Sequence, residues 1–533
     1  MRSSLVSFLF LVSLSASGQD FRPEAIRGHM QFLASDLLEG RGTGTRGYQV
    51  AADYVATQFE AAGLSPGVTS SYFQTIPFRK TVPGAQSSVT FTPDGATPVI
   101  LRFSEGFTTT GNPLQKDSTV EGQIVIVGYG VTAPELKHDD YAGLDVRGKI
   151  VGIFSGAPST FADSLRAHYS NRENKLQNAV DHGAAGIIQL SSRTDVERAP
   201  WDRVVRQSKL GAMHWLRADG TSHAVRAQIP NTVSLSTSAA EGLFAKAPRS
   251  FHEIADEVRK GGFRGFELPV RASIRTLSSH ERVESANVVG VIRGSDPALR
   301  DEYLVYSAHL DHVGIVEPVD GDSINNGAFD NASGIAAIIE IARAFGSRKA
   351  PKRSIIFLAT TGEEKGLRGA DYFANNPTVP IDQLVGNINI DQIMMLHALK
   401  DIVPLGIEVS TLGDMARKVA KKMGVEISKD PNPEEVYFVR SDQYAFVKRG
   451  VPAIYVGSGY KAVDPNIESE KEQMAWVKAI YHTPKDDLNQ KIDYSVGSML
   501  ARFNYLLGLE VANNPAPPAW TPGNFFGEKF GRR

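Results

Sequence analysis

The second half of the chain, from Ala286 onward, alternates short apolar runs with amphipathic stretches, and this alternation constrains the fold more than any other feature. Runs such as EYLVYSAHL and RSIIFLATT have the length of strands and are apolar almost throughout, whereas SGIAAIIEIARAF has the length and spacing of a helix. Strands without a polar face are typical of parallel sheets that helices cover on both sides. The sequence therefore predicts an α/β fold, a three-layer sandwich with a mainly parallel mixed sheet.

Acidic and histidine side chains follow several of these apolar runs. Because the carboxyl ends of parallel strands meet at one edge of a sheet, we expect these side chains to converge there. Imidazole and carboxylate groups without thiolates suit zinc or a similar divalent ion, and this number of groups suits a pair of ions better than one. The residues are His309, Asp311, Asp330, Glu363, Glu364, Asp391 and His482.

Two of these acids, Glu363 and Glu364, are adjacent. Successive side chains of a regular strand point to opposite faces, so a strand would send the two glutamates to different sites. After Gly362 the chain leaves the expected strand, and this constraint ends. One glutamate can then bind a metal ion while the other stays free to take the proton of an attacking water.

Simpler roles are expected for several residues of the same segments. Taken alone, Asp330 fits the cap of a helix that begins near Gly334. We expect His312 to serve its loop rather than a metal ion, and Asp486 and Asp487 to hold the loop that carries them.

The segments HLDHVG, GAFDNASG, TTGEEKGLRG, NINID and YHTPKDD, in this order, resemble peptidase family twenty-eight, the co-catalytic di-zinc exopeptidases that include secreted aminopeptidases and glutamate carboxypeptidases. The resemblance covers the chain from about Ala286 to the C-terminal helix, and the N-terminal segment LEGRGTGTRG is also similar to family members. It implies the zinc exopeptidase fold, two zinc ions and peptide substrates.

The resemblance also implies a set of metal ligands. His309 and Asp391 would hold one zinc ion. Glu364 and His482 would hold the other, and Asp330 would bridge the two ions.

Three further residues receive catalytic roles from the resemblance. Glu363 would be the general base, and Tyr481 would help to stabilise the oxyanion. Asp311 would orient His309, because metal-binding histidines commonly donate their other N–H to a carboxylate and residues two apart share one face of a strand.

The rest of the chain divides around this region. Residues 116–282 read as a β-rich unit, and its segments GYGV, DYAGLDVRGKIV and GAAGII resemble the protease-associated domain inserted in family members. We predict that residues 19–115 form the N-terminal part of the peptidase domain and residues 283–515 its catalytic part. Residues 516–533, rich in Pro and Gly, are expected to be an irregular tail.

The first residues and the composition bear on location and partners. Residues 1–18 have the apolar stretch and small terminal residues of a signal peptide. The chain has no cysteine, and export without disulfides favours a bacterial periplasm or the medium. A net charge of -2 provides no basic field for nucleic acid, and no later segment has the roughly 20 apolar residues that span a membrane, so neither is an expected partner. The oligomeric state is left open.

The sequence as a whole predicts a secreted di-zinc aminopeptidase, with its residue preference open. A carboxypeptidase of the same family is an alternative, which would need a cation such as Arg440 to bind the terminal carboxylate of the substrate. A glutaminyl cyclase-like enzyme is a second alternative, although such relatives use one zinc ion and a shorter chain. A non-catalytic binding or receptor-like protein on the same fold would have lost ligands, whereas all five are present here.

Overall fold

The computed structural model describes residues 21–192, 195–196 and 199–532. The predicted signal peptide, residues 1–18, lies outside the described residues. Within the described ranges, no helix combines the length and apolar character that crossing a bilayer requires. The architecture is mixed α/β, as the sequence predicts.

The larger sheet has a parallel centre and antiparallel flanks. Strands β17, β14, β18 and β21 are parallel neighbours, whereas β13 and β19 flank them in the antiparallel direction. The sheet is therefore mixed, as predicted. Its strands in spatial order are β11 (Ala212–Trp215), β2 (Phe73–Pro83), β13 (Phe266–Ile292), β17 (Ser354–Thr360), β14 (Tyr303–His309), β18 (Leu384–Asn389), β21 (Ala453–Ser458), β19 (Asp401–Leu405) and β20 (Glu426–Ile427), with β1 (Ser65–Pro66) beside β13.

Helices cover both faces of this sheet, which makes the third layer. Along β14, Leu304 and Tyr306 join the core on one face, whereas Tyr303 and Val305 join the core on the other. Every residue of the strand is buried, which explains its lack of a polar face. The first face packs against α1 (Pro23–Leu33), α2 (Arg46–Ala61), α9 (Ser333–Gly346), α11 (Leu412–Met423), α13 (Ser469–Ala479) and α14 (Tyr494–Asn513), and the second against α10 (Arg368–Asn375) and α12 (Gln443–Val447).

Local sequence signals set several of these helix ends. Thr45 accepts the N–H of Tyr48 at the start of α2, and Asp493 accepts the N–H of Ser495 at the start of α14. Helix α11 ends at Gly424, whose positive φ of 70° suits a residue without a side chain.

The second sheet is the β-rich unit expected from the middle of the chain. It has its own apolar core, and helices pack on it. Strands from Ser88 onward already pair within this sheet, and the predicted limits 116–282 stay a prediction. The order is β4 (Val99–Arg102), β3 (Ser88–Pro93), β13, β6 (Asp117–Ile126), β9 (Ile150–Phe154), β10 (Gly186–Leu190), β12 (Asn231–Leu235) and β5 (Phe107–Thr109), with helices α3 (Asp163–Ser170), α4 (Arg172–Asp181), α6 (Trp201–Lys209), α7 (Thr237–Leu243) and α8 (Phe251–Lys260).

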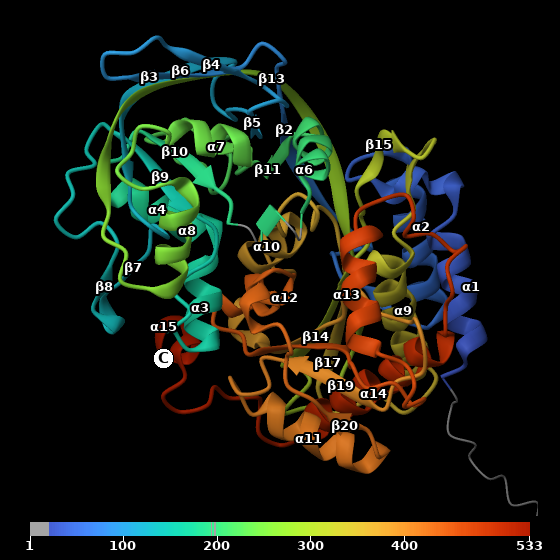
Figure 1. Ribbon diagram of the computed structural model, residues 1–533. Helices are drawn as coiled ribbons and strands as arrows, with labels where there is room; N and C mark the ends of the chain where they lie inside the picture. The colour runs from blue at the N-terminus through green and yellow to red at the C-terminus, as the bar shows by residue number, and fades with distance from the viewer. Residues whose placement is uncertain (1–20, 193–194, 197–198, 533) are drawn as a thin grey trace, which may run out of the picture.

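Strand β13 belongs to both sheets. Residues 266–277 pair with β6 and residues 278–288 pair with β2, so one unbroken strand of 27 residues joins the two units (Figure 1). Two small ribbons complete the strands: β7 (Thr132–Ala133) with β8 (His138–Asp139), and β15 (Gly314–Val319) with β16 (Asp322–Asn325).

The C-terminal tail differs from its prediction as an irregular segment. It forms a short helix, α15 (Phe525–Phe530), which Asn524 caps by accepting the N–H of Phe526. The Phe526 side chain is fully buried, with its ring centroid 5.5 Å from that of Phe438. Aromatic burial among Pro and Gly residues therefore orders this part of the tail.

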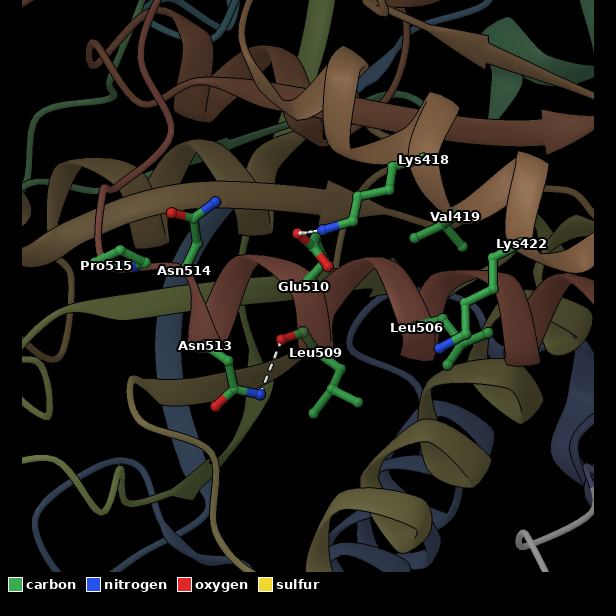
Figure 2. A pocket seen from close by; sticks show the side chains of 9 residues that line it. All are labelled: Lys418, Val419, Lys422, Leu506, Leu509, Glu510, Asn513, Asn514 and Pro515. Atoms are coloured by element: carbon green, nitrogen blue, oxygen red, sulfur yellow. Dashed lines mark hydrogen bonds and ion pairs between the residues drawn. The ribbon is translucent and has the colours of Figure 1, made fainter.

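A hollow lies between α11 and α14, away from the candidate site residues (Figure 2). Leu506, Leu509 and Val419 line it together with charged side chains. Lys418 and Glu510 form an ion pair of 2.6 Å at its edge, as Figure 2 shows.

Candidate metal centre

The predicted convergence at the sheet edge is present. Strand β14 ends at His309, β17 ends three residues before Glu363, and β18 ends two residues before Asp391. These strands are parallel neighbours, so their carboxyl ends bring the three side chains to one edge.

Asp330 lies between two groups of side chains. It occupies a tight π turn, Ala328–Ala332, immediately before α9, and is 3% exposed. Its Oδ1 is 3.1 Å from Nε2 of His309, and its Oδ2 is 3.0 Å from Nε2 of His482. One carboxylate thus presents an oxygen to each group, which is the arrangement that a bridging ligand requires.

The two groups share Asp330 and otherwise consist of different residues. In the first, Nε2 of His309 is 3.0 Å from Oδ1 of Asp391. In the second, Nε2 of His482 is 3.1 Å from Oε1 of Glu364. The candidate ligand atoms within each group lie within 4.8 Å of one another. The structure therefore brings together all five ligands that the resemblance implied.

His312 also belongs to the second group, although the sequence analysis expected it to serve its loop. It is fully buried, and its Nδ1 is 2.9 Å from Oε1 of Glu364 and 3.8 Å from Oδ2 of Asp330. Its position directly after Asp311, beyond a strand end, was the available signal. That signal was ambiguous, because the side chain of a loop residue can point either way.

Unpartnered polar atoms test whether these residues fit a metal centre. Both ring nitrogens of His312 and Oε1 of Glu364 are buried without a counted hydrogen-bond partner, although Nδ1 of His312 lies 2.9 Å from Oε1 of Glu364. Buried polar groups are rarely left unpaired in proteins. A set of imidazole and carboxylate donors around such atoms fits divalent zinc, one ion in each group.

The histidines and carboxylates of the site shift one another's pKa values in opposite directions: those of the histidines rise, and those of Asp330 and Glu364 fall. Burial opposes charge on His309 and His482, but the surrounding carboxylates outweigh it, raising the pKa of His309 well above its usual range and that of His482 to about 9. For Asp330 and Glu364, burial is likewise outweighed, and contacts with the histidines lower both pKa values well below the usual range. The histidine protons thus balance carboxylate charge that metal ions would otherwise balance.

Glu363 differs from its neighbour Glu364, because its carboxylate belongs to neither group of candidate ligands. Burial raises the pKa of Glu363 well above its usual range, and Glu364 and Asp391 add to this effect while His309 opposes it. The two adjacent glutamates therefore occupy unlike environments, as their position at a turn allows.

Asp311 contacts the site differently from the sequence expectation. Its backbone carbonyl, rather than its carboxylate, lies 3.0 Å from Nδ1 of His309. The carboxylate instead accepts the backbone N–H of Glu363 at 3.0 Å and the hydroxyl of Thr43 at 2.9 Å. Strand β14 ends at His309, so the rule that residues two apart share a face does not extend to Asp311.

The N-terminal loop LEGRGTGTRG supports the two loops of the site. Arg41 is fully buried and donates hydrogen bonds to the carbonyl oxygens of Leu310 at 2.9 Å and Gly327 at 2.9 Å. Burial lowers the pKa of Arg41 to about 10, while nearby carboxylates such as Asp486 oppose the shift. This loop thus fixes the backbone next to His312 and Asp330.

Two other residues complete the surroundings. The ring of Tyr481 stacks on His482 with a centroid distance of 3.7 Å, and burial raises its pKa well above the usual range. Asp442, which the sequence analysis did not single out, is fully buried and accepts the hydroxyl of Thr360. Burial raises the pKa of Asp442 to about 7, with Asp391 among the contributing charges.

Comparison with known proteins identifies relatives of this chain. Residues 287–505 match the sequence model of peptidase family M28. A probable zinc metalloprotease of Pyricularia oryzae is 24% identical over 316 residues, which are 54% of this chain and 61% of that protein. The mouse protein named aminopeptidase NAALADL1 is 34% identical over 141 residues, 24% of this chain and 17% of that protein. The chain thus spans less than two thirds of each of these relatives.

The solved structures extend the comparison to the fold. The aminopeptidase from Aneurinibacillus sp. strain AM-1 aligns with 95% of this chain and 97% of its own, with a TM-score of 0.55 and 19% identity. At this identity the likeness concerns the fold alone.

Proposed function

The chain belongs to peptidase family M28 through residues 287–505, and on this premise we propose that it is a di-zinc aminopeptidase that removes amino-terminal residues from peptides. The observation that carries the proposal is the position of Asp330, whose two oxygens face His309 and His482 separately. A bridging carboxylate of this kind places two ions close enough to act on one substrate.

The proposed ligands follow the two groups of side chains. His309 and Asp391 would hold one ion, Glu364 and His482 would hold the other with His312 beside them, and Asp330 would be shared by both. Zinc is favoured over magnesium or calcium because imidazole accompanies carboxylate in both groups.

The mechanism assigns separate tasks to the protein groups. When bound, the two zinc ions supply Lewis-acid chemistry that acidifies water and polarises the scissile carbonyl. Glu363, which is committed to neither group, takes the proton of the attacking water and then delivers it to the leaving amine. Asp311 holds the backbone of Glu363 in position for this transfer, and Tyr481 helps to stabilise the oxyanion.

The charges near the site favour an amino terminus over a carboxyl terminus as the group that is recognised. Arg440, the candidate cation for a carboxypeptidase, is paired with Glu435, with 3.1 Å between Nη1 and Oε2. Its charge is therefore already balanced. Carboxylates, by contrast, surround the two groups, and they attract the positively charged amine of a peptide.

A non-catalytic role and a cyclase activity each conflict with particular residues. A non-catalytic protein on this fold would have no need for the intact ligand set or for Glu363. In a glutaminyl cyclase-like enzyme with one zinc ion, the second group of candidate ligands, which contains two histidines, would bind no metal ion.

Two predictions from the sequence stay proposals on their original grounds. We propose that residues 116–282 are a protease-associated domain, supported by their separate core. Export to the periplasm or the medium rests on residues 1–18.

A zinc determination and one substrate panel test the proposed function. We expect about two zinc equivalents per chain. The protein should hydrolyse aminoacyl p-nitroanilides, but neither their N-acetylated forms nor chromogenic substrates with a free carboxyl terminus. Uptake of much less zinc, or full hydrolysis by Glu363→Ala, contradicts the proposal.

A further inference from the structure

The two histidines that contact Asp330 through Nε2 are oriented by different parts of the chain. Nδ1 of His309 lies 3.0 Å from the carbonyl oxygen of Asp311, which belongs to the same loop. Nδ1 of His482 instead lies 2.8 Å from the side-chain amide of Gln207. Gln207 is 275 residues away in sequence and lies on α6, within the predicted inserted domain.

Helix α6 is positioned to reach this histidine. It directly precedes β11, a short strand of this region that joins the larger sheet by pairing with β2. Figure 1 shows α6 beside β11 and close to β15. Residues four apart share one face of a helix, and accordingly Arg203 and Gln207 both reach the segment that ends at His482. Arg203 donates to the carbonyl oxygen of Lys478 at 2.6 Å.

We propose that Gln207 is a positioning residue for the metal centre, through which the inserted region sets the orientation of His482. This inference rests on the proposed function, because it assumes that His482 binds zinc. When Nε2 of a histidine faces a metal ion it carries no proton, so the neutral ring holds its proton on Nδ1. An acceptor at Nδ1 then fixes the orientation of the ring.

A primary amide can hydrogen-bond to Nδ1 of His482 whether or not that nitrogen carries a proton. Its NH2 group donates to Nδ1 when that nitrogen has no proton, and its oxygen accepts when Nδ1 carries one. A half-turn about the last side-chain bond of Gln207 exchanges the two arms. The side chain is exposed, so we expect its replacement to leave the packing of the core intact.

The test compares zinc binding by three variants of the full chain. Gln207→Leu keeps the approximate size and removes the contact, whereas Gln207→Glu keeps an acceptor for Nδ1–H. Arg203→Met is the matched control, because it removes another contact of α6 with the catalytic region and leaves Gln207 in place. Competition with a chromophoric chelator measures the two zinc equivalents separately, and the visible spectrum of the cobalt-substituted protein reports the ligand field of each site.

Substitution of a residue that orients a metal-binding histidine typically weakens metal binding by about 10- to 100-fold. We expect Gln207→Leu to weaken one zinc equivalent by this factor and to change the cobalt spectrum, leaving the other equivalent unchanged. Gln207→Glu should restore the parental affinity or exceed it, and Arg203→Met should leave both equivalents unchanged.

Three results would overturn the inference, and they can be told apart. Parental affinities for both equivalents in Gln207→Leu would remove the role of Gln207. Equal weakening in Arg203→Met would show that docking of α6, rather than the contact with His482, is what matters. If the parent protein itself failed to bind about two zinc equivalents, the proposed function would fail first and this inference with it.

Discussion

Asp486 holds the backbone of Asp330 in place, because its Oδ2 accepts the Asp330 N–H at 3.0 Å. Its Oδ1 accepts the N–H of the preceding residue, Phe329, at 2.9 Å. Both carboxylate oxygens of a fully buried residue are thus committed to the turn that carries the bridging side chain. The sequence suggested that Asp486 holds the loop that carries it. In the structure it also holds the turn at Phe329 and Asp330.

Asp486→Asn should destabilise this turn. The asparagine amide has a single acceptor oxygen, and its NH2 group would face a backbone N–H, leaving a buried donor unpaired. A group of this kind costs about 1–3 kcal/mol. Denaturant unfolding should show this loss, together with weaker zinc binding. Asp487→Asn is the control, since Asp487 serves an exposed turn by accepting the N–H of Asn489. Equal stability of the two variants would refute the anchor role.

The paired glutamates should respond differently to the same substitution. Glu363→Gln should retain about two zinc equivalents while kcat falls by roughly 10²- to 10⁴-fold, the usual contribution of a general base. Glu364→Gln should weaken zinc binding itself, because it replaces a charged ligand atom next to His482. Metal content and kcat, measured on the same preparations, separate the two effects. Loss of zinc from Glu363→Gln would show that the roles are reversed or shared.

His312→Gln tests whether this unexpected member of the second group contacts the metal ion. The Nδ1 atom of His312 has no hydrogen-bond partner, so a bound ion is the group that would satisfy it. We expect the variant to bind one zinc equivalent more weakly and the other normally, with isothermal titration as the measurement. His397→Gln is a suitable comparison, because His397 is buried elsewhere beside Ser469. A variant with both affinities unchanged would return His312 to the loop role expected from the sequence.

Acid should destabilise the protein through His168. Burial, reinforced by Lys529 and Lys448, lowers the pKa of His168 to about 3. Between the ordinary value of 6.5 and this value, the unfolded chain binds a proton that the folded protein does not. The free energy of unfolding therefore falls as the pH falls through this window, by up to about 1.4 kcal/mol per pH unit.

His168→Gln should lessen this dependence, because the neutral amide of glutamine does not take up a proton in this range. The amide can also keep a hydrogen bond with the Tyr444 hydroxyl, which lies 2.7 Å from Nδ1 of the imidazole. Urea unfolding across the acidic range, from neutral pH downward, measures the slope. An unchanged slope in His168→Gln would show that other groups account for acid sensitivity.

The sequence predicted those parts of the fold and site that depend on short segments. Continuous apolar runs identified the buried strands, and the parallel arrangement then required His309 and Asp391 to meet. The ligand types predicted a metal site of imidazole and carboxylate groups. These predictions were possible because strand burial and ligand type are properties of consecutive residues.

Contacts between distant segments could not be predicted in this way. Nothing near Gln207 or Arg41 in the sequence indicates that their side chains reach His482 and Leu310. The carboxylate of Asp311 was assigned to the wrong partner because the exact end of β14 decides which way the side chain points. Strand ends are set by tertiary packing, which local patterns do not contain.

The continuity of β13 has a consequence for how such a protein can be assembled in evolution. Pro83 and Ser278 face each other as partners across β2 and β13, so the intervening segment begins and ends at adjacent points of this strand pair, and it returns in between only to add β11 as an edge strand. A reverse turn of about two residues could close that gap. The whole intervening module could thus be acquired or discarded in one genetic event without re-routing the sheet. A shortened descendant would keep all the candidate ligands, but His482 would lose the contact between its Nδ1 and Gln207.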